Sequence, residues 1–525
     1  MDTSTMLLAL VACPLALSAI MAIVPKTASR GVFELCHAVS AVVVLAGSLA
    51  IALPVFTDGG EIWALDPWFH VDALGALFVL IIGIIGFCIA VYSIGLVRQL
   101  VADGVYGPDQ VKQYYAFYSL FLFTMLLAAT TNNIIIMWAA IEATTLASAL
   151  LVALKNTRHA LEATWKYIMV CTAGVAFGLF GTLLIYANAA DVISNPHMAA
   201  FLSGVLPEAD KLDPAIVRLA FAFIVIGFGT KAEVFPMHTW MPDTLSQAPG
   251  SISALLSGVV LKCSMLIIIR FDMVATHAIG NDFPSLLLLV IGVLSIAFSS
   301  FALFAQTDIK RKLAYSSCEN AGVIMLCLGI GGPLGIAAAL LHSMFHGLAK
   351  SLCFCLTENV EHAYGTRDLS QIRGIIERAP ITGALMVVGF LALAGFPPFA
   401  MFISEFGTFV AAFAAGSPWW LVVIVALALT VAISGLTRVV ISSVFGKTLH
   451  EPVDTERRES SIWMLIPEAL LAVCLIWFGL ATPLPVVRGV ENAVAIVLDQ
   501  DTDALHTAPM FREFFGSEAT QSEVK

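Results

Sequence analysis

Long apolar runs follow one another along most of this chain, and they restrict its fold more than any other feature. A helix that spans a bilayer needs about 20 predominantly apolar residues, and such runs recur from residue 5 to residue 481. They are continuously apolar rather than alternating, which argues against a membrane β-barrel. Only 12% of the residues are charged, against roughly 25% in a soluble domain. We therefore predict an all-α polytopic membrane protein with about 14 transmembrane helices, in the ranges 5–24, 31–53, 72–97, 113–131, 133–154, 161–188, 215–237, 250–271, 283–306, 311–330, 333–360, 381–416, 419–446 and 460–481.

The distribution of basic residues predicts the orientation of these helices. The first run has neither a basic segment before it nor an obvious cleavage site, so we expect a retained helix rather than a signal peptide. Basic connections stay in the cytoplasm, and the opposite connections contain Lys211 and little else. Both termini should then lie on the external side of the cytoplasmic (inner) cell membrane. The basic connections contain Lys26, Arg30, Arg98, Lys112, Lys155, Arg158, Lys310, Arg311, Lys312, Arg367, Arg373, Arg378, Lys447, Arg457 and Arg458.

Charged side chains also occur inside the apolar runs. Each charge at the centre of a spanning helix costs about 2.5–3.5 kcal/mol, so eight charges facing lipid would cost on the order of 20 kcal/mol. One such lysine can snorkel or form one static ion pair, but the cations here outnumber the carboxylates. We therefore predict a hydrated chain of titratable groups that face one another. The residues are Lys166, Lys231, Lys262, Lys350 and Arg438, with Glu142, Glu319 and Glu405, and with His342 and His346.

The spacing of these groups predicts an internal repeat. The two sets lie five predicted helices apart, and this odd number implies two inverted five-helix units. The residue types do not match between the sets, so spacing alone carries the prediction. The separations are 89 residues for Glu142 to Lys231 and 86 for Glu319 to Glu405, 24 for Glu142 to Lys166 and 23 for Glu319 to His342, and 120 for Glu142 to Lys262 and 119 for Glu319 to Arg438.

Prolines interrupt the seventh and twelfth runs. The stretch "GTKAEVFPMHTWMPD" (229–243) places Lys231 and Glu233 just before Pro236, and "GFPPF" (395–399) contains Pro397 and Pro398. A proline removes a helical hydrogen bond, which a membrane tolerates only beside protein or water. Broken helices at corresponding places in two inverted units are typical of an ion pathway near the midplane.

The eleventh run carries three titratable residues on one helical face. In "ALLHSMFHGLAKSLCF" (339–354), His342, His346 and Lys350 are spaced four residues apart. Lysine is a poor metal ligand, whereas buried lysine and histidine can both accept and release protons. We therefore interpret these residues as a proton relay rather than a zinc site.

No cofactor, metal or nucleic-acid site is predicted. The ten cysteines include no CxxC pair, which disfavours zinc and iron–sulfur ligation. The glycines of "GIGGPLG" (329–335) follow a spanning helix rather than a strand, so they do not indicate a dinucleotide site. There is no basic patch for nucleic acid. Any redox chemistry should belong to partner subunits.

Five stretches resemble one family. They are "GTKAEVFPMHTWMPDTLSQAP" (229–249), "LLSGVVLKCSMLIIIRF" (255–271), "DIKRKLAYSS" (308–317), "HSMFHGLAKSLCF" (342–354) and "GFPPFAMFISEF" (395–406). They look like the proton-conducting, antiporter-like membrane subunits of respiratory complex I, Mrp cation/proton antiporters and energy-converting hydrogenases. The chain is most similar to the hydrogenase-4 and formate-hydrogenlyase branch, particularly its F-type subunit. Glu233 departs from this pattern, since many relatives have Gly or Pro there.

The resemblance implies roles for individual residues and a division of the chain. Glu142 would pair with Lys231, Lys262 would link two half-channels, and Glu405 would lie nearest the exit, after the His342, His346 and Lys350 relay. The expected division is 1–110 for helices 1–3, 111–275 for the first repeat, 283–446 for the second repeat, 460–481 for helix 14, and 482–525 for a C-terminal tail. We expect the acidic part of this tail (500–525) to be an external surface segment.

These observations predict a proton-translocating subunit of a multisubunit, redox-driven oxidoreductase complex. Its partners would be other membrane subunits, lipid and a peripheral redox module. Three alternatives remain open. The chain could be an Mrp-type Na⁺/H⁺ antiporter subunit, or the ion-conducting membrane partner of a carbonic-anhydrase-like protein in inorganic-carbon uptake, or a non-conducting scaffold. The intact set of Glu142, Lys231, Lys262 and Glu405 disfavours the scaffold.

Overall fold

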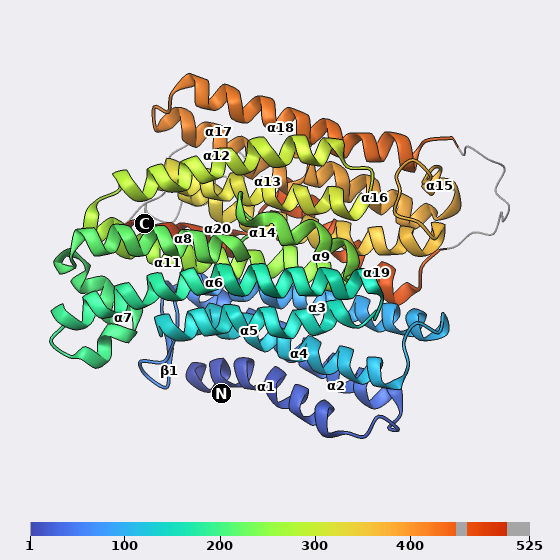
Figure 1. Cartoon of the computed structure of the whole chain (residues 1–525), viewed down its shortest axis with the longest axis horizontal. Helices are drawn as coiled ribbons and strands as arrows, with labels where there is room; N and C mark the ends of the chain where they lie inside the picture. Colours follow the sequence, from blue (N-terminus) through green and yellow to red (C-terminus); the bar gives the residue numbers. More distant parts are fainter. Residues whose placement is uncertain (1, 448–458, 501–525) are drawn as a thin grey trace, which may run out of the picture.

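The computed structural model describes residues 2–447 and 459–500 of the chain, and these residues form a bundle of helices (Figure 1). Arg457, Arg458 and residues 501–525 of the acidic segment lie outside the described residues. The predicted all-α class is confirmed.

Twelve helices among the described residues are long and apolar enough to cross a membrane. Two further predicted spans coincide with other elements. Helix α4 (Pro108–Thr130) is long but less apolar because of its tyrosines, and the twelfth run is divided between α16 (Pro380–Leu393) and α17 (Ala400–Ala414). The count of fourteen crossings therefore stays a prediction. The twelve are α1 (Thr3–Ile23), α2 (Arg30–Asp58), α3 (Ala73–Ala102), α5 (Ile134–Ala153), α6 (Arg158–Val192), α8 (Pro214–Lys231), the continuous α10–η4–α11 (Gly250–Ile279), α12 (Asp282–Ala305), α13 (Ile309–Ile330), α14 (Gly332–Tyr364), the continuous α18–η5 (Trp419–Val444) and α19 (Ile462–Leu480).

Short elements connect these helices. A two-stranded antiparallel hairpin joins α2 to α3. Helix α20 forms within the segment predicted as a tail, and its valine-rich face packs against α2, α3, α11 and α14. The short elements are β1 (Ile62–Ala64), β2 (Phe69–Val71), η1 (Pro196–Ala200), α7 (Leu202–Val205), η2 (Leu206–Lys211), η3 (Met237–Trp240), α9 (Met241–Gln247), α15 (Ile375–Arg378) and α20 (Leu484–Leu498).

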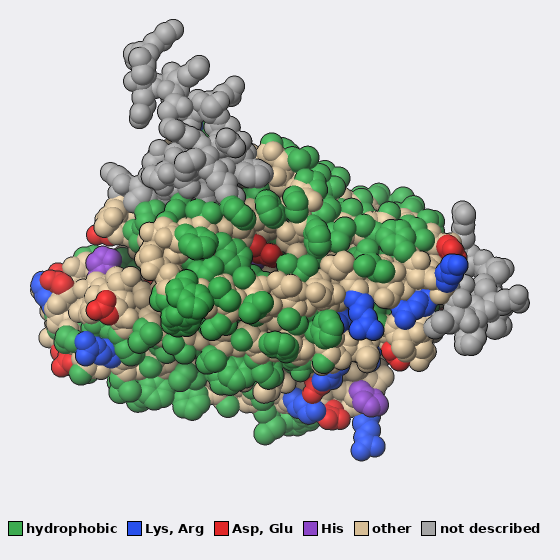
Figure 2. Space-filling model, turned by 90° about the horizontal axis from the view of Figure 1, so that it is seen from above, with side chains coloured by type: hydrophobic (Ala, Val, Ile, Leu, Met, Phe, Trp, Pro, Cys, Tyr) green, Lys and Arg blue, Asp and Glu red, His purple; other side chains and the backbone are tan. Residues whose placement is uncertain are grey.

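Helices α10–η4–α11 and α14 form the centre of the bundle. Their most apolar windows are completely buried, whereas fewer than half of the residues in those of α1, α6 and α18 are buried. The outer helices show apolar side chains to their surroundings, as a helix facing lipid does. Figure 2 shows that these side chains cover the middle of one face, while most visible Lys and Arg gather toward one end. That end also carries α15, and the N-terminus and α20 lie toward the other end (Figure 1).

Both predicted helix breaks are present. Helix α8 ends at Lys231, and η3 begins six residues later, after Pro236. Helix α16 ends at Leu393, and α17 begins at Ala400, after Pro397 and Pro398. Two wider π-helical turns occur as well, η4 (Leu256–Val260) and η5 (Val440–Val444). The breaks agree with two related units, but the inverted repeat itself stays a prediction.

Glycines bring α6 and α8 unusually close together. A Cβ atom at Gly227 would collide with the backbone of Gly178. The small residues therefore let the two helix backbones touch, as they do in many membrane bundles. This contact positions the C-terminal end of α8, and hence Lys231, against the side chains of α6.

Candidate functional site

Lys231 lies at the broken end of α8 and is almost completely buried, with 1% of its surface exposed. Its Nζ donates to Thr145 Oγ1 on α5 at 3.0 Å and to Tyr167 Oη on α6. The ammonium also lies 4.4 Å from the Tyr167 ring centroid and 5.6 Å from that of Trp240. A cation over an aromatic face is stabilised by about 0.5–2 kcal/mol. Lys231 therefore has neutral partners that can hold its charge without a carboxylate.

Glu142 does not form an ion pair with Lys231 in this structure. Thr172 Oγ1 donates to Glu142 Oε1 at 2.8 Å, and Glu142 Oε2 is buried without a hydrogen-bond partner among the described residues. The predicted pair is thus in an open arrangement, in which each member has a different partner.

Glu233 lies in the break itself, where the chain turns sharply. Its φ is +64°, in the left-handed region that only glycine adopts without strain. The carboxylate is buried, and neither oxygen has a hydrogen-bond partner among the described residues. A strained, buried carboxylate without a partner indicates a functional position.

Lys262 on α11 contacts α14, the helix that carries His342, His346 and Lys350. Its Nζ donates to the Ser257 carbonyl oxygen at 2.7 Å and lies 2.7 Å from His346 Nδ1. Ser257 lies in the π-helical turn η4, a wider turn that ends two residues before Lys262. With Lys262 as the donor, His346 Nδ1 accepts and its Nε2 carries the proton. This Nε2 is buried without a partner among the described residues.

His342 continues this line of polar groups. Its ring lies 6.0 Å from that of His346, centroid to centroid, and the two are nearly parallel. His342 Nε2 lies 3.0 Å from Asn320 Oδ1, and Asn320 Nδ2 donates to Glu319 Oε2 at 2.6 Å. His342 Nδ1 lies 3.0 Å from Ser404 Oγ on α17. The structure therefore brings Lys262, both histidines and Glu319 into one buried series across α11, α14 and α13.

Lys350 occupies the same face of α14, as predicted, but it does not join the series by a hydrogen bond. Its Nζ donates to the Leu313 carbonyl oxygen at 2.6 Å. The Lys350 side chain is fully buried, and this carbonyl is the hydrogen-bond partner that the described residues give it.

Glu405 lies beside the second helix break, on α17. A Cβ atom at Gly395 would collide with its carboxylate, and Gly395 itself has φ +67°. Glycine is therefore required there both by the backbone and by the close approach of the carboxylate. Among the described residues, no hydrogen bond or ion pair joins Glu405 to the central series.

The structure differs from the prediction for Lys166 and Arg438, which are exposed rather than buried. The Lys166 side chain is 49% exposed and pairs with Glu162 and Asp243. Arg438 on α18 is exposed as well. Each residue is inside an apolar run, but its side chain is not buried in the centre of the bundle.

Two buried polar networks were missed by the sequence analysis. Lys310 is fully buried and pairs with Glu358 at 2.5 Å and with Glu361 at 2.6 Å. On the other side of α14, Asn359 donates to the buried carboxylate of Glu468 at 2.8 Å. Glu358 and Glu468 both stand inside apolar runs, so the rule applied to the other charges would have found them. Tyr167 and Asn320 gave no such signal.

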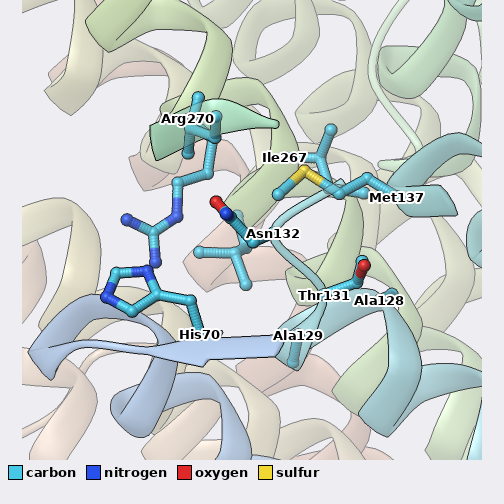
Figure 3. A pocket seen from close by; sticks show the side chains of 10 residues that line it. His70, Ala128, Ala129, Thr131, Asn132, Met137, Ile267 and Arg270 are labelled. Carbon is cyan, nitrogen blue, oxygen red and sulfur yellow. The ribbon is translucent and has the colours of Figure 1, made fainter. Parts of the chain in front are cut away.

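A third polar site lies where α3 begins. Arg270 on α11 forms a two-pronged ion pair with Asp72, with contacts of 2.5 and 2.6 Å. Burial alone would raise the pKa of Asp72, but the Arg270 guanidinium lowers it to about 2. Arg270, His70 and Asn132 line a cavity of about 10 Å³, room for one water molecule. Figure 3 shows Arg270 pointing toward His70 across this space.

Comparisons with known proteins agree with this architecture. Residues 131–431 match the family described as NADH:quinone oxidoreductase/Mrp antiporter, transmembrane. A hydrogenase-4 component F homolog of Methylacidiphilum infernorum is 37% identical over 350 residues, which are 66% of this chain and 73% of that protein. An NADH-quinone oxidoreductase subunit N of Desulforudis audaxviator is 29% identical over 466 residues, 84% of this chain and 89% of that one.

A solved structure shows the same fold over nearly the whole chain. It is the archaeal membrane-bound sulfane sulfur reductase, a respiratory membrane complex, in which one subunit superposes with a TM-score of 0.82 at 23% identity. The match covers 94% of this chain and 97% of that subunit. Both broken helices and the buried lysines lie within or beside the matched family region. The chain belongs to the NADH:quinone oxidoreductase/Mrp antiporter family of membrane subunits.

Proposed function

We propose that this chain is the proton-translocating membrane subunit of a multisubunit complex of the hydrogenase-4 or complex I type. One observation carries the proposal. A buried series of polar groups lies at the centre of the bundle, in two hydrogen-bonded parts: Lys262 with His346, and His342 with Asn320 and Glu319. The hydrogen bonds are 2.6–3.0 Å long, and a 6.0 Å step between the two histidine rings separates the parts. Lysine, histidine and glutamate can each hold or release a proton, so a proton can pass along such a series.

Lys231 would act as the entry switch. In the open arrangement its ammonium donates to Thr145 and Tyr167, and Glu142 is bound to Thr172. A shift of Lys231 toward Glu142 would form the pair that the family resemblance implies. The loss of that pair would favour release of the proton toward Glu233 and Lys262. Lys350 and Glu405 would then pass the proton from Glu319 to the exit.

Lys166 and Arg438 have no place in this route, because both are exposed. We keep Glu142, Lys231, Glu233, Lys262, Glu319, His342, His346, Lys350 and Glu405 as the proposed relay. We further propose that both termini are external, that 111–275 and 283–446 are the two inverted units, and that a peripheral redox module binds the basic end in the cytoplasm. The carbonic-anhydrase-like module stays an alternative.

The site favours H⁺ over Na⁺ as the transported ion. Glu233 offers one buried carboxylate, and neither of its oxygens has a hydrogen-bond partner among the described residues. Among residues 2–447 and 459–500, no group of three or more His, Cys, Asp and Glu side chains could hold a metal ion. A hard cation needs several oxygen ligands.

We therefore expect proton flux to be independent of sodium. Replacing Na⁺ by choline on both sides of proteoliposomes that contain the complex should leave the initial rate of proton uptake unchanged. The rate is measured with a pH-sensitive dye at constant ionic strength. A rate that rises with Na⁺ concentration and saturates would instead support the antiporter alternative.

The Lys231→Ala variant tests the proposed function directly. We expect it to lower proton flux on the order of 100-fold, the usual contribution of a positioned proton-transfer group. Lys166→Ala is the matched control, because Lys166 lies on the neighbouring helix but its side chain is 49% exposed. It should pump normally. Normal pumping by a correctly assembled Lys231→Ala complex would refute the relay.

A further inference from the structure

A basic cavity lies at the α15 end of the bundle, outside the relay. It has a volume of about 180 Å³ and lies between the ends of α12, α13 and α18–η5 and the connection after α14. Lys312, Arg373 and Arg438 line it, together with Gln306 and several hydroxyl side chains, and none of its lining residues is acidic. Three cations thus come from three separate parts of the chain to one cavity.

The charges of these cations are not neutralised by described carboxylates. Lys312 Nζ donates to the Leu303 carbonyl oxygen at 2.7 Å. Arg373 Nη1 donates to the carbonyl oxygens of Leu369 at 3.0 Å and Ser442 at 3.1 Å. Among the described residues, no hydrogen bond or ion pair is formed by Arg438, which is close enough to Lys312 to repel it. Cations held together in this way favour an anionic ligand.

A buried hydroxyl is a second, independent observation that indicates a ligand-binding site. Ser443 on η5 lines the cavity, is 0% exposed, and its Oγ has no hydrogen-bond partner within the described part of the chain. A buried polar atom without a partner is unfavourable, because it has given up its hydrogen bonds to water. A ligand oxygen in the cavity would supply the partner.

The surroundings of the cavity are apolar and exposed. Phe301 and Phe304 on α12 are 64% and 46% exposed, and Ile441 and Phe445 beside Ser443 are 64% and 58% exposed. In Figure 2 the apolar face adjoins the end where most visible Lys and Arg gather. The cavity therefore lies where the lipid-facing surface meets the basic end of the bundle. Acyl chains could lie along these four side chains.

We propose that this cavity binds the phosphate group of an anionic phospholipid from the leaflet at the basic end. Lys312, Arg373 and Arg438 neutralise the phosphate, and Ser443 donates a hydrogen bond to it. Basic cavities between membrane helices are suited to such headgroups. The bound lipid would join α13 and α18 to the connection that follows the relay helix α14. The proposal does not depend on the proton route.

Arg438→Gln tests the site without endangering the fold, because the side chain is exposed and makes no hydrogen bond or ion pair to a described residue. The matched control is Arg158→Gln, since Arg158 is an exposed arginine at the start of α6. The purified complex is titrated in neutral detergent with phosphatidylglycerol, with phosphatidylcholine and with inorganic phosphate. Native mass spectrometry measures the lipid retained, and the thermal unfolding midpoint measures protection.

We expect preferential retention of phosphatidylglycerol, with an affinity about fivefold weaker in Arg438→Gln and unchanged in Arg158→Gln. Equal retention of phosphatidylcholine, or an unaltered affinity in Arg438→Gln, would overturn the proposal. Protection by inorganic phosphate as strong as that by phosphatidylglycerol would assign the cavity to a free phosphate and overturn the lipid.

Discussion

Replacing Lys262 with methionine should reduce proton flux to the background leak, a loss on the order of 100-fold or more. Lys262 makes the 2.7 Å contact with His346, where the series from α11 to α14 begins. Methionine keeps most of the side-chain volume and removes the only group that can carry a proton at this position. Flux is measured in proteoliposomes that contain the whole complex, after assembly has been checked by co-purification.

A second variant separates proton transfer from charge. Lys262→Arg keeps a positive charge beside His346, but arginine cannot be deprotonated in a protein. If Lys262 carries the proton, Lys262→Arg should be as inactive as Lys262→Met. Recovery of most of the flux by arginine would show that the charge alone matters, and that the proton bypasses this residue.

Replacing Asp72 with asparagine should lower the free energy of unfolding by about 3–5 kcal/mol, because Arg270 is left as a buried charge without a partner. Asparagine can still accept the 2.8 Å hydrogen bond from the Gly75 amide that begins α3, so the change isolates the charge. Unfolding is followed by denaturant titration in detergent micelles. The matched control is Asp109→Asn, which removes a pair with Lys26 whose side chains are 58% and 60% exposed. An exposed pair contributes at most about 1 kcal/mol.

The pH dependence of the Asp72 contribution has a definite sign. The pKa of Asp72 is lowered from 3.8 to about 2 in the folded chain, so the unfolded chain binds its proton more readily. The proton-linked stabilisation, about 2 kcal/mol, is fully present above pH 3.8 and is lost as the pH falls toward 2. The difference between the wild type and Asp72→Asn should therefore be constant from pH 5 to pH 8. A difference that changes within this range would show that another group titrates with the pair.

The helices and the two breaks could be predicted from the sequence, because both depend on local chemistry. Continuous apolar runs have few foldable alternatives in a bilayer, and Pro236 and the Pro397–Pro398 pair cannot continue a helix. Helix α20 could not be predicted in this way. A helix of fifteen residues (Leu484–Leu498) is too short to span the membrane. Its apolar face is buried only because α2, α3 and α14 pack against it.

The candidate site was only partly predictable. The spacing of His342, His346 and Lys350 placed them on one face, and the structure buries all three. The rule that a charge inside an apolar run is buried was wrong for Lys166 and Arg438, because position in a run does not determine which way the helix turns the side chain. Tyr167 and Asn320 were missed, because a hydroxyl or an amide in a membrane helix is too common to stand out.

The sequence by itself determined that this chain spans a membrane many times, where two of its helices break, and which titratable groups it carries within the apolar runs. These properties follow from the free energy of transfer of each residue into lipid, which is largely local. Only the tertiary structure decided which groups meet. Lys231 is held by Thr145 and Tyr167 rather than by Glu142, and Lys262 reaches His346 where α10 and the π-helical turn η4 pack on α14. The partner of a buried charge depends on how each helix is rotated and on which distant segments pack together. Neither can be read from the residues of one helix alone.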